Sequence, residues 1–295
     1  MKTVLITGVQ GFVGQHLRTA IEQAGLEPVS FDGDIRERPA IAARIAEVSP
    51  DGIVHLAALA SVAASWGAEH DVWETNATGT HNLVSAMRAH APEARLIAVS
   101  SAEVYGVVPE AEQPIGESHA CSPRSPYALS KFAAELPVLH SGLDAVVARP
   151  FPHLGPGQDE RFAIASFAAQ IARIEAGADD SLLRVGNLDA RRDFTDVRCV
   201  CEAYVALLDT PVTGMIVNIA SGVALRIGDV LQRLLALAAV PIETAVDEAR
   251  LRPADVPLLC GDATRLREAT GWKPRRSLDE TLSDTLDAFR RKGPA

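Results

Sequence analysis

Gly8-Val9-Gln10-Gly11-Phe12-Val13-Gly14 follows the apolar run Val4-Leu5-Ile6 and leads into an amphipathic stretch over residues 12–24. Strand, tight turn and helix in this order are the setting in which a glycine-rich loop binds a dinucleotide. Backbone N–H groups at the start of such a helix, exposed by the glycines, can bind a pyrophosphate. We therefore expect five residues to contact a dinucleotide cofactor: Gly8, Gly11, Phe12, Val13 and Gly14.

Strand-like and helix-like segments alternate beyond this loop. We expect strands at residues 2–7, 28–31, 52–56, 95–100 and 144–148, and helices at 12–24, 39–48, 69–90 and 125–141. The apolar runs do not alternate with polar residues, which is typical of parallel strands covered on both faces. The sequence predicts an α/β Rossmann-type, doubly wound parallel sheet in residues 1–165 and about 193–222. A smaller C-terminal substrate-binding lobe would comprise residues 166–192 and 223–295.

Composition limits the class of protein. The 295 residues carry a formal net charge of −10, which argues against a general nucleic-acid binder. No apolar run approaches ~18 residues and no signal peptide precedes the first strand, so we expect a cytoplasmic protein without a membrane span. The four cysteines lack zinc-type spacing, and we expect no metal site.

Ser101, Tyr127 and Lys131 form the candidate catalytic set. Tyrosine and lysine four residues apart share one face of a helix. An unperturbed phenol has a pKa of ~10, and a nearby ammonium would lower it toward the working range. Ser101 follows a predicted strand and could hold a carbonyl oxygen against the phenol. The three side chains predict acid–base catalysis at a carbon that gives or takes hydride.

Asp32 follows the second predicted strand, about twenty residues beyond the glycines. A carboxylate there can accept a hydrogen bond from an adenosine ribose hydroxyl and would repel a 2′-phosphate, which favours NAD(H) over NADP(H). We include Asp34 in the same cofactor contact, although both aspartates also suit a turn. Arg36 and Arg38 lie close by in sequence and could offset the repulsion, so both coenzymes stay open.

Several motifs together resemble the extended short-chain dehydrogenase/reductase family that acts on nucleotide sugars. They are the glycine loop, His55-Leu56-Ala57-Ala58, Asn76-x-x-Gly79-Thr80, Ser100-Ser101-Ala102-Glu103-Val104-Tyr105-Gly106 and Pro126-Tyr127-Ala128-Leu129-Ser130-Lys131. The resemblance covers essentially the whole chain. It implies that Ala57 and Ala58 line the cofactor channel, and that relatives often form homodimers through two long helices of each subunit.

The second half looks most like the GDP-4-keto-6-deoxymannose reductases. The matching runs are residues 149–158, 185–197 and 250–257. The resemblance implies a GDP-sugar substrate, with Asn187 beside the guanine, Arg192 and Arg252 on the diphosphate, and Asp255 as a further contact. Relatives usually carry asparagine where this chain has Pro152, a departure that could signal a different sugar such as a heptose.

Relatives that dehydrate a 4-keto sugar place an acid and a base directly after the catalytic Ser or Thr. Here the first position is Ala102, which cannot transfer a proton, while Glu103 could act as a base or orient the substrate. We therefore expect reduction of a GDP-4-keto-6-deoxy sugar by NADH or NADPH. The alternatives are a nucleotide-sugar 4-epimerase or 4,6-dehydratase with bound NAD(P), and a cofactor-sensing protein that has lost its chemistry.

Overall fold

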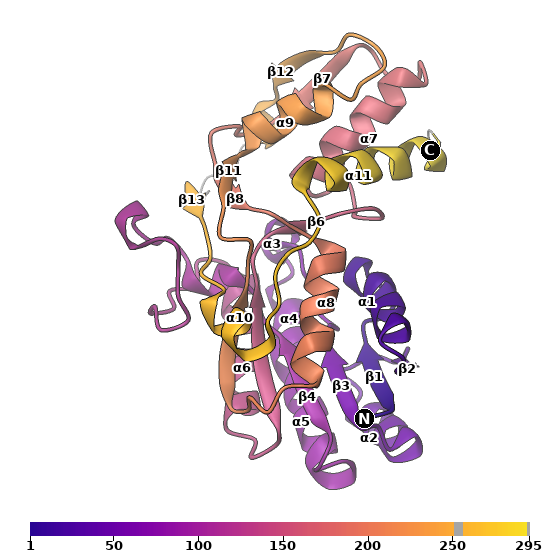
Figure 1. The fold of residues 1–295 in the computed structure, drawn as a ribbon, viewed down its shortest axis with the longest axis vertical. Helices are drawn as coiled ribbons and strands as arrows, with labels where there is room; N and C mark the ends of the chain where they lie inside the picture. Colours follow the sequence, from indigo (N-terminus) through magenta and orange to yellow (C-terminus); the bar gives the residue numbers. More distant parts are fainter. Residues whose placement is uncertain (251–255, 294–295) are drawn as a thin grey trace.

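Six parallel strands form the central sheet in the order β10-β5-β4-β3-β1-β2 (Figure 1). The computed structural model describes residues 1–250 and 256–293. The strands are β1 (Thr3–Thr7), β2 (Glu27–Phe31), β3 (Gly52–His55), β4 (Arg95–Val99), β5 (Ala145–Pro150) and β10 (Met215–Ile219). The order reverses between β1 and β3, and ligands of open α/β sheets bind at the carboxyl ends of strands beside such a reversal. The predicted doubly wound parallel sheet is confirmed.

Helices cover both faces of this sheet. Along β1, Val4 and Ile6 point to one face and Leu5 to the other, as the period of two in a strand requires. Helices α1 (Phe12–Gln23) and α8 (Val197–Leu208) pack on the first face. The second face is covered by α2 (Arg38–Val48), α5 (Gly79–His90) and α6 (Pro126–Leu139). The interior strands β1, β3, β4 and β5 are therefore buried on both sides, which explains their apolar runs, whereas the edge strand β2 is only partly buried.

The helix expected over residues 69–90 contains a wider turn. It consists of α4 (Glu69–Trp73), a π-helical turn (Glu74–Thr78) and α5. Asn76 lies in the π turn, where its amide nitrogen donates to the Leu59 carbonyl at 3.2 Å and to the Ser130 hydroxyl at 2.9 Å. Its amide oxygen accepts from the Leu59 N–H at 2.8 Å. Asn76 thus fixes the loop after β3 against α6.

The second half of the chain adds smaller sheets and a separate apolar cluster. Strands β8 (Arg191–Asp193), β11 (Ala224–Arg226) and β13 (Leu258–Leu259) form one sheet, and β7 (Leu182–Val185) pairs with β12 (Glu243–Val246). Strand β6 (His153–Leu154) pairs with β9 (Thr195–Asp196). Helices α7 (Ala163–Glu175), α9 (Ile227–Leu235) and α11 (Leu278–Lys292) share the cluster and lie together at the top of Figure 1.

Parts of residues 193–295 pack with the central sheet. Strand β10 pairs with β5, and α10 (Thr264–Thr270) follows β13 back toward that sheet. Leu266 and Trp272 lie in the same apolar cluster as β1, and the Trp272 indole N–H donates to the Cys199 carbonyl at 2.9 Å. The C-terminal third of the chain thus contributes to both packed regions.

Within residues 1–250 and 256–293, none of the helices combines the length and the apolar character that crossing a bilayer requires. The four cysteines carry free thiols. The same residues contain no group of three or more His, Cys, Asp or Glu side chains placed to hold a metal ion.

Candidate active site

The glycine loop between β1 and α1 has room for glycine alone at two positions. Gly8 has a φ of +75°, and a Cβ there would lie 2.7 Å from the Ala57 backbone nitrogen. A Cβ on Gly14 would lie 2.5 Å from the Gly8 carbonyl oxygen, whereas one on Gly11 would face open space apart from that oxygen at 3.3 Å. The N-cap residue of α1, Gly11, has no side chain to cap the first N–H groups of the helix. This geometry is compatible with a dinucleotide pyrophosphate, and the contacts of the five predicted residues stay a prediction.

The end of β3 lies against this loop. Ala57 and Ala58 are half-buried, and the Ala57 N–H donates to the Thr7 hydroxyl at 3.2 Å. His55 joins two strands and a helix, because its Nδ1 lies 2.7 Å from the Thr7 hydroxyl and its Nε2 lies 3.0 Å from that of Thr80. Burial lowers the pKa of His55 to about 3, so the imidazole is neutral. The two alanines therefore follow a strand end that is hydrogen-bonded to β1 and to α5.

The loop after β5 closes the other side of α1. Phe12 and Val13 are half-buried, and the Phe12 ring stacks on His153 at 6.1 Å between centroids. The His16 ring lies 2.8 Å from the Pro156 carbonyl oxygen. These contacts bring the start of α1, where the glycine loop ends, beside the chain that leaves β5.

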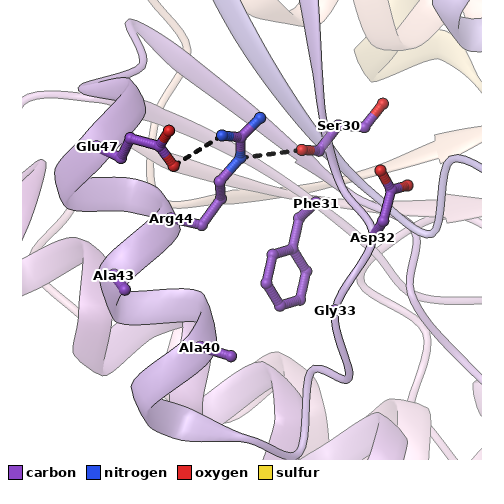
Figure 2. A pocket seen from close by; sticks show the side chains of 8 residues that line it. All are labelled: Ser30, Phe31, Asp32, Gly33, Ala40, Ala43, Arg44 and Glu47. Atoms are coloured by element: carbon purple, nitrogen blue, oxygen red, sulfur yellow. Dashed lines mark hydrogen bonds and ion pairs between the residues drawn. The ribbon is translucent and has the colours of Figure 1, made fainter.

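A pocket between β2 and α2 holds Asp32 at its edge (Figure 2). Asp32 is exposed, and the Gln10 amide donates to it at 3.4 Å. In Figure 2 Arg44 points back toward the strand, where its Nε donates to the Ser30 carbonyl at 3.1 Å and its Nη1 contacts Glu47 at 2.8 Å. The guanidinium of Arg44 in this pocket is thus bound to Ser30 and Glu47, and the carboxylate of Asp32 faces solvent.

Asp34 is exposed as well, but Arg36 holds it. The two side chains approach to 2.6 Å, and Arg36 lies 3.7 Å from Asp71. The hydrogen bonds from Arg36 lower the pKa of the Asp34 carboxyl. Two carboxylates therefore balance the charge of Arg36.

The three predicted catalytic side chains come together at the carboxyl end of β4. Ser101 directly follows that strand region, and Tyr127 lies in the first turn of α6, which Ser125 caps through the Ala128 N–H at 3.1 Å. Lys131 lies one turn later. All three are buried, and a hydrogen bond joins the Ser101 hydroxyl to the Tyr127 phenol.

Burial is the main cause of the shifted pKa values of Tyr127 and Lys131. It raises the pKa of Tyr127 to about 12, helped by the charge of Glu103 and opposed by the hydrogen bond with Ser101. It lowers the pKa of Lys131 to about 8, opposed by the charge of Glu135. The expectation that the ammonium brings the phenol pKa below its ordinary value is wrong, because desolvation outweighs the favourable interactions. Tyr127 is protonated at neutral pH.

Ala102 and Glu103 lie in a short 3₁₀ helix, η2 (Ala102–Tyr105). Ala102 is buried in the apolar cluster under the sheet, so its position offers no proton donor. The backbone N–H of Glu103 donates to the Ser101 hydroxyl oxygen at 3.2 Å, and its side chain is half-buried close enough to Tyr127 to affect that pKa.

A buried ion pair that was not predicted from the sequence lies behind these residues. Glu135 on α6 binds Arg149 on β5 at 2.6 Å and also accepts from the Ser100 hydroxyl at 2.5 Å. Glu135 lies four residues after Lys131, so the same spacing rule that selected Tyr127 and Lys131 indicates that it shares their face of the helix.

The expected substrate residues lie in or beside the small sheets of the second half of the chain, or outside the described residues. Asn187 is exposed between β7 and β8, and its side-chain oxygen accepts from the Asp189 N–H at 2.9 Å. Arg192 is half-buried in β8, where it donates to the Arg191 carbonyl at 3.0 Å. Pro152 follows β5, and its carbonyl accepts from the Thr195 N–H at 3.0 Å. Arg252 and Asp255 fall in residues 251–255, outside the described residues.

The fold and the Ser-Tyr-Lys site define an extended short-chain dehydrogenase/reductase. Residues 21–285 match the family model described as GDP-mannose 4,6 dehydratase, and the chain belongs to this family. It is 38% identical over 291 residues to a GDP-6-deoxy-D-mannose reductase of Pseudomonas aeruginosa, covering 96% of this chain and 95% of that one. It is 30% identical to a UDP-glucose 4-epimerase of Yersinia pestis, with 96% of each covered.

Solved structures give the same family placement. The structure of RMD from Pseudomonas aeruginosa complexed with NADPH superposes with a TM-score of 0.91 at 34% identity, covering 99% of this chain and all of that one. The UDP-glucose 4-epimerase of Thermus thermophilus in complex with NAD gives a TM-score of 0.85 at 28% identity, covering 98% and 99%.

Proposed function

We propose that the protein is an NAD(P)H-dependent oxidoreductase that reduces the 4-keto group of a GDP-4-keto-6-deoxy sugar, of the mannose or heptose type, to the GDP-6-deoxy sugar. The observation that carries this proposal is the buried contact of Ser101 with Tyr127, one turn from Lys131, beside an alanine at position 102. The resemblance to the Pseudomonas aeruginosa GDP-6-deoxy-D-mannose reductase supports the substrate class.

The catalytic roles follow from protonation states. The reduced nicotinamide, when bound, supplies a hydride to C4. Tyr127 holds its proton at neutral pH because its pKa is raised to about 12, and it donates that proton to the developing alkoxide. Ser101 donates a second hydrogen bond to the same oxygen. Lys131 has a pKa of about 8 and is mostly an ammonium at pH 7, where it favours the phenolate that Tyr127 becomes.

Ala102 argues against a 4,6-dehydratase, although the family model carries that description. Elimination of water needs an acid for the departing hydroxyl, and a buried methyl group stands where such relatives place one. Glu103 remains as the carboxyl group that follows Ala102, so a dehydratase would have to draw its acid from another group. Ketone reduction needs no acid for a departing hydroxyl.

A 4-epimerase is the second candidate, favoured by the resemblance to the Yersinia pestis enzyme. Both reactions use the same three side chains. They differ in the coenzyme, because an epimerase keeps NAD bound and shows no net consumption of it. One experiment separates them: the loss of reduced-nicotinamide absorbance with GDP-4-keto-6-deoxymannose, followed by analysis of the sugar product. Stoichiometric oxidation of the reduced coenzyme with this substrate supports the reductase. If a GDP-hexose is instead converted to its product without net oxidation of the coenzyme, the epimerase is supported.

For the coenzyme, the groove beside Asp32 supports NADH over NADPH. Asp32 is exposed directly after β2. Arg44, which lines the same pocket, is paired with Glu47, and Arg36, four residues after Asp32, is paired with Asp34. A 2′-phosphate would meet a carboxylate and find these guanidinium groups engaged, which disfavours it. The relative solved with NADPH shows that the fold accommodates that coenzyme too.

The coenzyme preference is tested by titrating the protein with NADH and NADPH and following nicotinamide fluorescence, without substrate. We expect NADH to bind about tenfold more tightly, and Asp32→Asn to reduce this ratio toward one. Arg38→Ala is the matched control, because Arg38 starts α2 nearby. Tighter binding of NADPH that Arg38→Ala removes would show instead that Arg38 holds a 2′-phosphate.

The substrate contacts and the two-lobe division belong to the same proposal. We assign cofactor binding to residues 1–165 and about 193–222, and the nucleotide sugar to residues 166–192 and 223–295. In this arrangement Asn187 borders the guanine, Arg192 and Arg252 bind the diphosphate, and Asp255 adds a contact. An arginine fork suits phosphate oxygens. Arg192→Ala is expected to raise KM for the GDP-sugar and leave nicotinamide binding unchanged.

A homodimer is the proposed assembly. The two long helices that relatives often use for pairing correspond here to residues 69–90 and 125–141. Leu83, Val84 and Met87 on α5 lie in the core under the sheet and are therefore not available for an interface. Helix α6 presents Leu136 and Leu129, which are 51% and 49% exposed. Leu136→Glu is expected to convert a dimer to a monomer in light scattering.

Free thiols at all four cysteines are compatible with the reducing cytoplasm, which we propose as the location of the protein.

A further inference from the structure

Glu135 and Arg149 form an ion pair inside the protein, behind the catalytic residues. Their side chains are 2% and 3% exposed. Two nitrogens of Arg149 donate to the two carboxylate oxygens of Glu135, at 2.8 and 2.6 Å. Removing both charges from water offsets most of their attraction, so stability alone gives little reason to keep such a pair. Its contacts with the active site give a better reason.

The pair joins the elements that carry the catalytic side chains. The Ser100 hydroxyl donates to Glu135 at 2.5 Å, and Ser100 immediately precedes Ser101. The guanidinium of Arg149 lies 4.8 Å from the centre of the Tyr105 ring, at the end of the short helix that follows Ser101. The end of β4, the η2 helix and α6 are thereby held in one buried network.

Lys131 faces this network from one turn earlier on α6. Among the described residues near it on other elements, His55 on β3 is neutral because burial lowers its pKa to about 3, and Glu103 on η2 lies close enough to Tyr127 to raise the pKa of that phenol. Arg149 on β5 is itself bound to Glu135. Burial lowers the pKa of Lys131, and the carboxylate of Glu135 opposes that shift.

We propose that Glu135 is a positioning residue of the active site. Through Ser100 it fixes the strand end that carries Ser101, and its negative charge keeps Lys131 in the ammonium form that Tyr127 requires. The kinetic part rests on the proposed reductase function, because it is measured on that reaction. The charge part concerns Lys131 alone and is measured without substrate.

The first measurement follows the titration of Lys131 by NMR. The chain has four lysines, so the ¹³Cε signals of labelled lysine are few, and Lys131→Arg assigns the one of interest. The test variant exchanges both partners, E135Q/R149Q, so that no unpaired charge stays in the core. We expect the midpoint of Lys131 to fall, because losing the negative charge of Glu135, on the same helix face, outweighs losing the positive charge of Arg149 on β5.

The second measurement is the pH profile of kcat/KM, whose limbs report groups of the free enzyme. In E135Q/R149Q we expect the alkaline limb to move to lower pH together with the NMR midpoint. Ser100→Ala keeps the charge and removes the contact to the strand end. We expect it to lower kcat by about tenfold at every pH without moving the limb, since misplaced catalytic groups lose rate.

Asp144→Asn is the matched control, because it breaks the Arg95–Asp144 pair at the start of β4, 2.6 Å long and outside the site. It is expected to leave the Lys131 midpoint and the alkaline limb in place. A folded E135Q/R149Q protein with a wild-type midpoint would overturn the charge role. If that variant does not fold, Glu135→Asp serves: an unchanged midpoint with reduced kcat is expected, and wild-type kcat would overturn the positioning role. If the Lys131 midpoint shifts as expected but the wild-type protein shows no reductase activity, the proposed reaction is wrong and the charge role of Glu135 still holds.

Discussion

The Glu135–Arg149 pair behind the catalytic residues and the Asp34–Arg36 pair after β2 have the same closest approach, 2.6 Å, and differ in contact with water. Glu135 and Arg149 are nearly fully buried, whereas Asp34 and Arg36 are 40% and 45% exposed. Salt screens exposed charges over about 8 Å at physiological ionic strength, and buried pairs are screened much less. Although the two distances are equal, we expect different effects. The buried pair should change the positions and pKa values of the catalytic groups, and the exposed pair should change how readily anions approach the end of β2.

The sheet topology explains this difference. Strand β2 is an edge strand of the six-stranded sheet, so the residues after it face solvent. Strands β4 and β5 are interior strands covered by helices on both faces, and residues at their ends are desolvated together. The dinucleotide would span both environments, with its reactive end on the buried side.

Tyr127→Phe tests the buried side most directly. Removing the hydroxyl removes the proton donor but leaves the ring that fills the site. We expect turnover to fall by about 10²- to 10⁴-fold, the usual contribution of a general acid, while coenzyme affinity survives. Steady-state kinetics and nicotinamide fluorescence measure the two quantities. Unchanged function in this variant would favour a cofactor-sensing protein over an enzyme.

Arg149→Met asks what the buried pair contributes to stability. It leaves the Glu135 carboxylate without its partner in the core, which we expect to lower the free energy of unfolding by about 3–5 kcal/mol. Urea unfolding followed by circular dichroism measures the change. The double variant E135Q/R149Q is the control and should lose much less, since no lone charge remains. Equal losses in both variants would mean that packing, rather than the charge, determines the effect.

Much of the fold could be predicted from the sequence, because burial on both faces leaves long apolar runs in the strands. Gly8 and Gly14 were recognisable since backbone contacts exclude a Cβ at both positions. Ser101, Tyr127 and Lys131 were recognisable by spacing, and the structure places them together. The π turn at residues 74–78 was not predictable, because it depends on the tertiary contact of Asn76 with Ser130.

The pairing of charges was the harder part. Glu135 shares a helix face with Lys131, but its partner Arg149 lies on a strand that only the folded sheet brings near. The direction of the Tyr127 pKa was wrong for a related reason, since desolvation depends on everything packed around the phenol. Spacing rules capture neighbours on one element and miss partners across elements.

His55 tests the buried side through pH. Its pKa is about 3 in the fold against 6.5 ordinarily, so between these values the unfolded chain binds a proton that the native protein does not. Stability should therefore fall as pH drops below 6.5, with about 2 kcal/mol of this loss due to His55 between pH 7 and pH 5. Urea unfolding of His55→Asn at both pH values should show a smaller decrease than wild type. If the free energy of unfolding falls equally in the wild type and in His55→Asn, carboxylates rather than His55 cause the loss of stability in acid.

Arg36→Ala tests the exposed Asp34–Arg36 pair, and we expect it to give the smallest change in stability of these variants. Water and salt already screen exposed ion pairs, so we expect the free energy of unfolding to stay close to that of the wild type. Asp34 would lose the hydrogen bonds that lower its pKa, and the local charge after β2 would become more negative. NADPH binding should therefore weaken more than NADH binding at low salt, with the difference shrinking as salt is raised. A stability loss comparable to that of Arg149→Met would show that exposure does not separate the two pairs.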